Sequence, residues 1–547
     1  MNLRAARVTH DVQNQPPLFE DVDLFAGDAA LREAVERWDA GWALDELGEV
    51  GRRSGSRELF ELGRLANIYT PKLRTHSDQG HRLDEVEFHP AYHQLMEAQM
   101  RHGAHCLGWT AGRPGAHVAR AAIFYLLTQP EAAVSCPISM THAVVPSLRN
   151  APELAAEWEP RIASRVYDPS FRPASEKRGV TLGMAMTEKQ GGSDVRANTT
   201  EAAPLSGDEY LLRGHKWFCS APMCDAFLTL AQAPGGLTCF FVPRWLPDGT
   251  KNNFFVQRLK EKLGNRANAS SEIEYDQTWA RRVGEEGRGV STIIEMVHST
   301  RIDVSLGCAG IARQAVARAI HHCRHRAAFG KRLVEQPLML NVLADLALET
   351  EAATTLALRV THAMDRAQAG DAAEGAFGRI ATAVAKYWIA KRCPAVIVEA
   401  LECHGGNGYV EEGMLARLYR EAPLGSIWEG SGNVQCLDVL RALRRTPEAL
   451  PALLGELESA RGGDARLDAA LDGLRAELSD PADVEPRARR LVERLALTLQ
   501  ASLLVRHAPQ PVADAFCGSR LVEGWRELGT LAPGGDHAAI VARALPG

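Results

Sequence analysis

A glutamate between an aromatic residue and a glycine marks a segment that could do acid–base chemistry. The segment reads IWEGSGN at residues 427–433, and its carboxylate belongs to Glu429. A carboxylate becomes a useful general base when a dry environment raises its pKa towards the working pH. Trp428 would help to exclude water, and Gly430 would let the backbone approach a ligand closely. Taken alone, Glu429 could equally be a solvated loop carboxylate, as most glutamates are.

A second segment combines the end of a possible strand with glycines and hydroxyls. It reads MAMTEKQGGSD at residues 184–194. Its glycines allow close approach of backbone amides to a ligand, and the hydroxyls of Thr187 and Ser193 can both donate and accept hydrogen bonds. By itself this pattern is also typical of an ordinary glycine-rich turn.

Four further segments carry aromatic, hydroxyl or cationic side chains. They are GHKWFCS at 214–220, KLGNR at 262–266, RAAFG at 326–330 followed by Gln336, and HGGNGY at 404–409. An arginine such as Arg326 presents a planar fork of donors, which is well suited to a pyrophosphate.

Taken in chain order, the six segments resemble the motifs of the acyl-CoA dehydrogenase superfamily. The resemblance implies an FAD cofactor, with residues 184–194 and 214–220 beside the flavin ring. It also implies that Arg326 and Gln336 reach the cofactor of a neighbouring subunit. The cofactor contacts implied in this way are Met184, Met186, Thr187, Gly192, Ser193, Phe218, Cys219, Ser220, Arg326, Phe329, Gln336, Gly405, Gly406, Trp428, Ser431 and Asn433.

Glu429 stands where most members of the superfamily carry their catalytic base. The resemblance implies that Glu429 removes the α-proton of an acyl-CoA thioester while the flavin accepts the β-hydride. In the family, a ribityl hydroxyl and the backbone N–H of the base hold the thioester carbonyl as oxyanion-type donors. We expect a short or branched substrate similar to isovaleryl-CoA. Two positions depart from the family pattern: Glu402 replaces a glutamine near the adenine, and Phe218 replaces a tryptophan on the flavin face.

Several details narrow the resemblance to the AidB-like branch of alkylation-response proteins. They include Lys189-Gln190 after the glutamate, Trp428 in place of tyrosine, CPI at 136–138 and the extra C-terminal helices. The branch implies a homotetramer with FAD, weak acyl-CoA dehydrogenase activity and an affinity for double-stranded DNA. An alternative function therefore stays open: a DNA-alkylation-response protein that binds duplex DNA non-specifically, with little dehydrogenase turnover.

The elements that must position these segments are mostly helical. Helical periodicity extends over residues 1–180, 288–445 and 446–547, whereas short apolar runs between Gly and Pro predict a β domain at 181–287. We predict a mainly α fold with a central β domain, similar to acyl-CoA dehydrogenases. Its parts would be an N-terminal helical domain, a β-barrel or sandwich domain contacting the flavin, a helical bundle and an extra helical domain. The junction between β domain and helices is a common place for a cofactor.

The composition is that of an ordinary globular protein. Of the 547 residues, 46% are hydrophobic and 24% charged, and the formal net charge is −6. The N-terminus lacks the apolar core of a signal peptide, and no apolar run approaches the roughly 20 residues that span a bilayer. We expect a cytoplasmic protein whose eleven cysteines are reduced thiols. His321 and His325 are four residues apart, but no further ligand completes a site, so no metal is expected.

Duplex binding would require a basic surface. Residues 446–547 contain eleven Arg, no Lys and fifteen Asp or Glu, which is a poor electrostatic footprint for phosphates. A local basic patch, or simply a solvated helix face, could be formed by Arg441, Arg444 and Arg445 just before this segment, with Arg487, Arg489, Arg490 and Arg494 within it. Binding would be non-specific, because no helix-turn-helix or finger signature is present.

Overall fold

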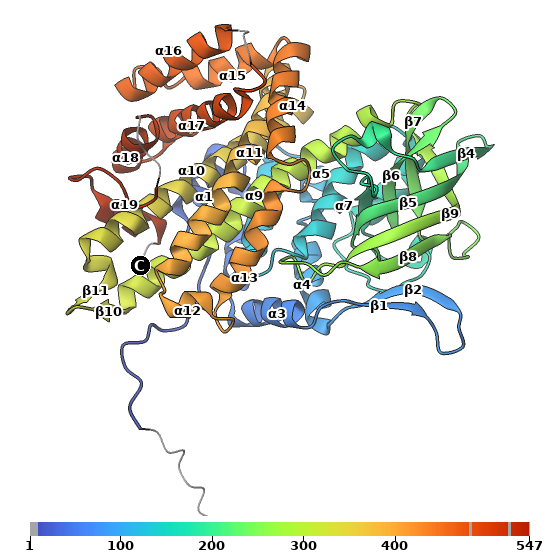
Figure 1. Ribbon diagram of the computed structural model, residues 1–547, viewed down its shortest axis with the longest axis horizontal. Helices are drawn as coiled ribbons and strands as arrows, with labels where there is room; N and C mark the ends of the chain where they lie inside the picture. Colours follow the sequence, from blue (N-terminus) through green and yellow to red (C-terminus); the bar gives the residue numbers. More distant parts are fainter. Residues whose placement is uncertain (1–8, 481–483, 523–526, 546–547) are drawn as a thin grey trace, which may run out of the picture.

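A helical bundle separates the β domain from the C-terminal helices (Figure 1). The computed structural model describes residues 9–480, 484–522 and 527–545. The predicted fold class, mainly α with a central β domain, is confirmed. Within these ranges, every helix is too short or too polar to cross a membrane.

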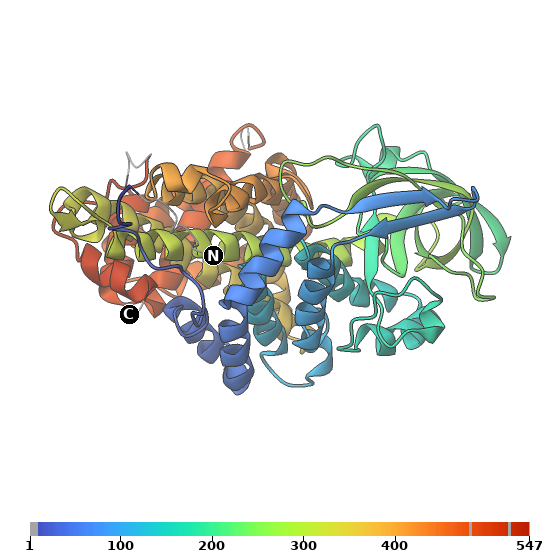
Figure 2. The ribbon, with the colours of Figure 1, turned by 90° about the horizontal axis from the view of Figure 1, so that it is seen from below.

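The N-terminal region is helical but also contains a hairpin that its periodicity did not indicate. Strands β1 (Lys72–His76) and β2 (Arg82–Glu87) pair antiparallel and extend along the β domain (Figure 2). Asp84 Oδ1 accepts a 2.8 Å hydrogen bond from the Val256 backbone N–H, which attaches the hairpin to the β domain. The helices of this region are α1 (Ala29–Arg37), α2 (Leu44–Ser54), α3 (Arg57–Ile68), α4 (Pro90–Arg101), α5 (Leu107–Thr110), α6 (Ala116–Thr128), α7 (Ser135–Leu148) and α8 (Pro152–Ile162).

The β domain closes on itself, because β6, β7, β9, β5 and β4 pair in a ring. In β5, Lys216 pairs with Ile273 and Cys219 with Ser271, so β5 has one extra residue and bulges at Trp217 and Phe218. The strands are β3 (Leu182–Ala185), β4 (Glu201–Ser206), β5 (Glu209–Ser220), β6 (Ala226–Ala233), β7 (Gly236–Pro243), β8 (Phe254–Leu259) and β9 (Ser270–Val283).

Three long helices form the centre of the bundle. Most of α9 is buried, because helices from the N-terminal region and from the bundle pack around it. The bundle consists of α9 (Gly289–His325), α10 (Pro337–Gln368), α11 (Ala372–Glu402), α12 (Gly406–Tyr409), α13 (Met414–Glu421) and α14 (Gly432–Arg445), with the short hairpin β10 (Ala327–Ala328) and β11 (Lys331–Arg332).

The C-terminal helices pack on the bundle through buried charges as well as leucines. Arg520 is completely buried and pairs with Asp345 and Glu349 of α10. Leu467, Leu471 and Leu474, which recur at helical spacing, are buried. The helices are α15 (Ala449–Glu458), α16 (Ala465–Ser479), α17 (Ala488–His507), α18 (Gln510–Arg520) and α19 (His537–Ala544).

Candidate active site

Glu429 lies in the loop before α14 and has a left-handed backbone, with φ of 57°. This conformation is unfavourable for a residue with a side chain, so neighbouring groups must hold it. Arg301 Nε and Gln435 Nε2 donate to the Glu429 carbonyl oxygen at 3.1 and 2.9 Å. Lys386 Nζ donates to the next carbonyl, that of Gly430, at 2.6 Å. Three donors from α9, α14 and α11 therefore hold the successive carbonyl groups of Glu429 and Gly430.

Glu429 as a whole is half-buried. Thr300 Oγ1 of α9 donates to Glu429 Oε2 at 2.8 Å. Burial raises the pKa of Glu429, although the hydrogen bond from Thr300 and the charges of Arg301 and Lys386 oppose this increase. A carboxyl whose pKa is raised by burial has a property required of a general base.

The glycine-rich segment after β3 is attached to the bulge of β5. The Trp217 backbone N–H, displaced from the ladder by the bulge, donates to the Thr187 carbonyl oxygen at 2.8 Å. A Cβ on Gly192 would lie only 2.4 Å from Thr187 Oγ1, so only glycine fits there. Met184 is buried in β3, while Met186 and Thr187 are half-buried and Ser193 is exposed.

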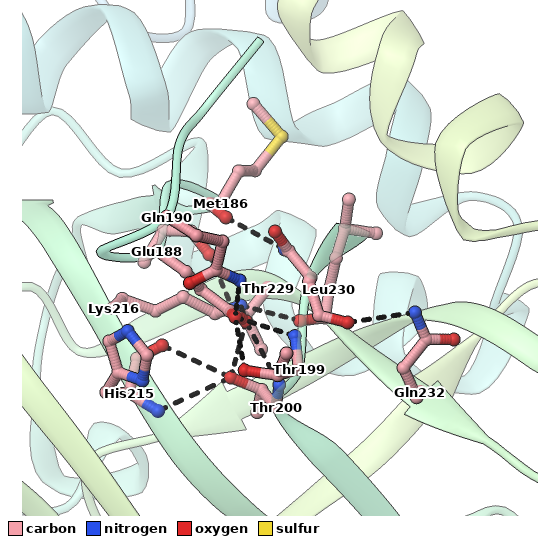
Figure 3. Close-up of polar contacts among 12 residues, drawn as sticks. Met186, Glu188, Gln190, Thr199, Thr200, His215, Lys216, Thr229, Leu230 and Gln232 are labelled. Carbon is pink, nitrogen blue, oxygen red and sulfur yellow. Dashed lines mark hydrogen bonds and ion pairs between the residues drawn. The ribbon is translucent and has the colours of Figure 1, made fainter. Parts of the chain in front are cut away.

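Glu188 of this segment forms an ion pair with Lys216, and neither side chain is exposed to solvent (Figure 3). Lys216 Nζ donates to Glu188 Oε1 at 2.7 Å and to the Leu230 carbonyl oxygen at 2.8 Å. Burial raises the pKa of Glu188, but Lys216 and the donors of Thr199 and Thr200 outweigh it and lower that pKa to about 2. Glu188 is therefore ionised and accepts several hydrogen bonds at the base of the loop.

The bulge also determines how the predicted residues of β5 are presented. Phe218 is 49% exposed, as a ring that contacts a ligand should be. Cys219, by contrast, is completely buried in the β-domain core, so that only its backbone could lie near a cofactor. Burial, with a smaller contribution from Glu429, raises the pKa of the Cys136 thiol to about 12, although the charge of Lys262 and a hydrogen bond with Ser220 oppose the increase.

Five of the remaining predicted cofactor residues lie beside the β10–β11 hairpin and α12, whereas Ser431 and Asn433 lie at the start of α14. Arg326 Nη1 donates to the Asn14 carbonyl oxygen at 2.6 Å, and Gln336 Nε2 donates to that of Ala328 at 3.1 Å. Phe329 is fully exposed, and a Cβ on Gly405 or Gly406 would meet no atom within 4 Å. Phe329, Gly405 and Gly406 are thus open to the surface.

Sequence reasoning missed the residues that hold Glu429. Thr300 and Arg301 are consecutive on α9, and Lys386 lies on α11, so only the folded bundle brings them to the loop. Their own segments carry no glycine-rich or hydroxyl-rich pattern that would have singled them out. Trp428 packs between the bundle core and the β-domain core, and its buried Nε1–H lacks a partner among the described residues.

Comparison with known proteins accounts for nearly the whole chain. Residues 14–169 match the N-terminal domain of the adaptive response protein AidB, residues 183–278 the acyl-CoA dehydrogenase middle domain, and residues 287–444 its C-terminal domain. The chain is 45% identical to AidB of Escherichia coli (strain K12) over 511 residues, which cover 93% of this chain and 94% of that protein. The chain belongs to the AidB-like branch of the acyl-CoA dehydrogenase family.

Solved structures of this family agree with the fold. ACDH-11 of Caenorhabditis elegans, in complex with C11-CoA, has a TM-score of 0.86 and 27% identity, covering 96% of this chain and 95% of that chain. An acyl-CoA dehydrogenase of Bacillus anthracis complexed with FAD shares the fold with a TM-score of 0.66 and 18% identity, covering 79% and 81% of the two chains.

FAD is the cofactor of this AidB-like flavoprotein. Several features of the site fit such a group. The exposed face of Phe218 and the half-buried Thr187 present an aromatic surface and a hydroxyl for a flavin ring. The unpartnered Nε1–H of Trp428 and the open backbone of Gly405 offer further places for a ligand to make contact.

Proposed function

We propose that this protein is an acyl-CoA dehydrogenase in which Glu429 abstracts the α-proton of a short or branched acyl thioester. The observation that supports this role is the fixed, half-buried Glu429, whose carboxyl pKa is raised by burial. Backbone strain at φ 57° is a further sign, since such strain is concentrated at functional sites.

The residues of the chain have separate tasks in this proposal. Glu429 receives the α-proton on a carboxylate oxygen, and its backbone N–H is a candidate donor to the thioester carbonyl. Arg301, Gln435 and Lys386 hold the loop so that the carboxylate does not have to reorganise during the reaction. Bound FAD supplies the oxidation by accepting the β-hydrogen with its electron pair. Thr187, Phe218 and Ser220 would hold the flavin ring beside Glu429.

The test is anaerobic titration of the FAD-containing protein with a series of acyl-CoA thioesters from isovaleryl-CoA to C11-CoA. The longer end of the series is included because ACDH-11 was solved with C11-CoA. We expect at least one thioester to bleach the visible flavin band. Glu429→Gln should slow this bleaching by about 100-fold or more, because a general base typically contributes two to four orders of magnitude.

Glu412→Gln is the matched control, since it makes the same chemical change at an exposed glutamate. It should bleach like the wild type and retain the same amount of FAD. If Glu429→Gln kept a tenth or more of the wild-type rate, Glu429 would not be the base.

A second candidate function, non-specific binding of duplex DNA, is supported by three exposed arginines near the end of α14. Arg441 pairs with Asp438 at 3.2 Å, whereas Arg444 and Arg445 form no ion pair among the described residues. Farther along the chain, Arg490 and Arg494 both pair with Glu477, which reduces their availability for phosphates.

An electrophoretic shift of a duplex at low salt tests this function. We expect binding that weakens steeply as salt increases and is lost when Arg441, Arg444 and Arg445 are changed together to Ala. The FAD content of the triple variant should stay at the wild-type level. Absence of any shift at low salt would exclude DNA as a partner.

A further inference from the structure

The Thr300 hydroxyl lies within hydrogen-bond distance of two acceptors. Its Oγ1 is 2.8 Å from Glu429 Oε2 and 3.0 Å from the backbone carbonyl oxygen of Val297, one turn earlier in α9. A hydroxyl has one proton to donate and two lone pairs that can accept. Thr300 can therefore donate to only one of these oxygens at a time. Its Oγ1 can also accept a hydrogen bond from another group.

A catalytic base needs a compatible environment in two protonation states. Ionised Glu429 can only accept hydrogen bonds, so in this state the Thr300 O–H donates to Oε2. Protonated Glu429 has an O–H of its own, which can donate to Thr300 Oγ1 while the Thr300 O–H turns to the Val297 carbonyl. Glu429 Oε2 and the Thr300 hydroxyl thus keep a partner in both states, and of the Thr300 group only the hydroxyl proton has to rotate.

The charged and titratable groups that face Glu429 come from several elements. Arg301 of α9 and Lys386 of α11 are positively charged, and both lower the pKa of Glu429. Arg301 is itself paired with Asp438 of α14 at 2.7 Å. The Cys136 thiol of α7 is held neutral by burial. Arg301 and Lys386 donate to the backbone carbonyls of Glu429 and Gly430. Thr300, by contrast, donates to the Glu429 carboxylate itself.

We propose that Thr300 is a positioning residue that gives Glu429 a hydrogen-bond partner both before and after the carboxylate accepts a proton. The inference rests on the proposed role of Glu429 as the base. It goes further, because it assigns a role to Thr300, which lies on α9 outside the Glu429 loop. Thr300 would set the balance between ionised and protonated Glu429. A charge-assisted hydrogen bond is stronger than a neutral one, so loss of the hydroxyl penalises ionised Glu429 more than protonated Glu429.

The experiment compares the FAD-containing wild type with Thr300→Val and Thr300→Ser. The first readout is infrared titration of the protonated Glu429 carboxyl, whose band is identified by its absence in Glu429→Gln. The second is the acidic limb of the pH profile of kcat/KM for flavin reduction by the best thioester. Thr361→Val is the matched control, because Thr361 is also buried and its hydroxyl donates to a carbonyl of its own helix, that of Ala357.

Thr300→Val should move the infrared midpoint and the acidic limb to higher pH by about one unit, since a hydrogen bond to a charged group contributes roughly that much. Thr300→Ser and Thr361→Val should coincide with the wild type. Thr300→Ala is measured alongside, with the same expectation, in case the valine variant does not fold. A folded variant without the hydroxyl whose midpoint equals the wild-type value would overturn the inference. If no thioester reduced the flavin but the infrared midpoint still moved, the proposed function would fail and the pairing of Thr300 with Glu429 would hold.

Discussion

Glu188 and Lys216 have no solvent-exposed side-chain surface, and burial of two charges costs several kcal/mol unless their pairing is close. Their closest atoms are 2.7 Å apart, and Thr200 Oγ1 adds a donor at 2.6 Å on the Glu188 carboxylate. Thr187, which precedes Glu188, accepts a hydrogen bond from the Trp217 backbone N–H of β5. The buried pair therefore stabilises the segment that we assign to the flavin ring.

Glu188→Gln should destabilise the protein by about 3–5 kcal/mol, because it leaves the Lys216 charge buried without its counterion. FAD should also be lost more readily during dialysis. Both effects can be measured by denaturant unfolding and by the visible spectrum. Glu201→Gln, at an exposed position of β4, is the control, and it should change neither quantity. Adding Lys216→Met to Glu188→Gln should restore part of the stability; no recovery would argue against a buried charge as the cause.

Individual site residues differ in how far the sequence could predict them. Glu429 and Thr187 belong to continuous segments whose glycines and hydroxyls are visible in the chain, so the sequence alone could propose them. Thr300 lies in an ordinary helical stretch, 129 residues before Glu429. Its role depends on the packing of α9 against the loop, and no local pattern encodes such a distant contact.

Among the elements, α6 and α7 share a cluster of buried histidines with the turn that precedes α5. His105 Nε2 lies 2.9 Å from the Ser164 carbonyl oxygen, and His117 Nε2 lies 2.8 Å from Gln368 Oε1. Burial lowers the pKa of both His105 and His117 to about 4, and it also lowers that of His142. The folded protein therefore holds these imidazoles neutral.

Stability should fall as the pH decreases from about 6.5 towards 4, because the unfolded chain then binds protons that the folded protein excludes. The stabilisation is complete above the unfolded pKa of about 6.5, and each histidine contributes a slope of about 1.4 kcal/mol per pH unit below it. His105→Gln should therefore lose about 2 kcal/mol less than the wild type between about pH 7 and pH 5 in urea unfolding. His81→Gln, in the exposed turn of the β1–β2 hairpin, should follow the wild-type curve. Parallel curves for His105→Gln and the wild type would contradict the assignment.

Elements with a strong apolar period could be predicted, whereas elements defined by their partners could not. The helical periodicity of residues 446–547 and the short apolar runs of residues 181–287 indicated helices and strands, and both are present. The β1–β2 hairpin consists largely of polar residues and is attached by the Asp84 carboxylate to β8, so its own periodicity is weak. The bulge at Trp217 depends on the register between β5 and β9, which is a non-local property.

At the scale of the whole molecule, one chain does not complete the predicted cofactor site. Arg326, Phe329 and Gln336 lie beside the β10–β11 hairpin, whereas Glu429 is next to the β domain. Phe329 is fully exposed with φ of 51°, and Leu338 is 84% exposed near it in sequence. Large apolar side chains exposed at the surface are suited to a protein interface. We expect this surface to be covered by another copy of the chain, whose cofactor these residues would contact.

Phe329→Asp should therefore disrupt the assembly and lower FAD retention together, because a charge would be buried at the subunit contact without a partner. Light scattering after gel filtration gives the mass, and the visible spectrum gives the FAD content. Leu205→Asp makes a similar change at an exposed leucine of β4, and it should leave both quantities unchanged. A Phe329→Asp protein with the wild-type mass and full FAD content would mean that the exposed ring serves neither the subunit contact nor the cofactor. A lower mass with full FAD content would keep Phe329 in the interface but assign the cofactor to a single chain.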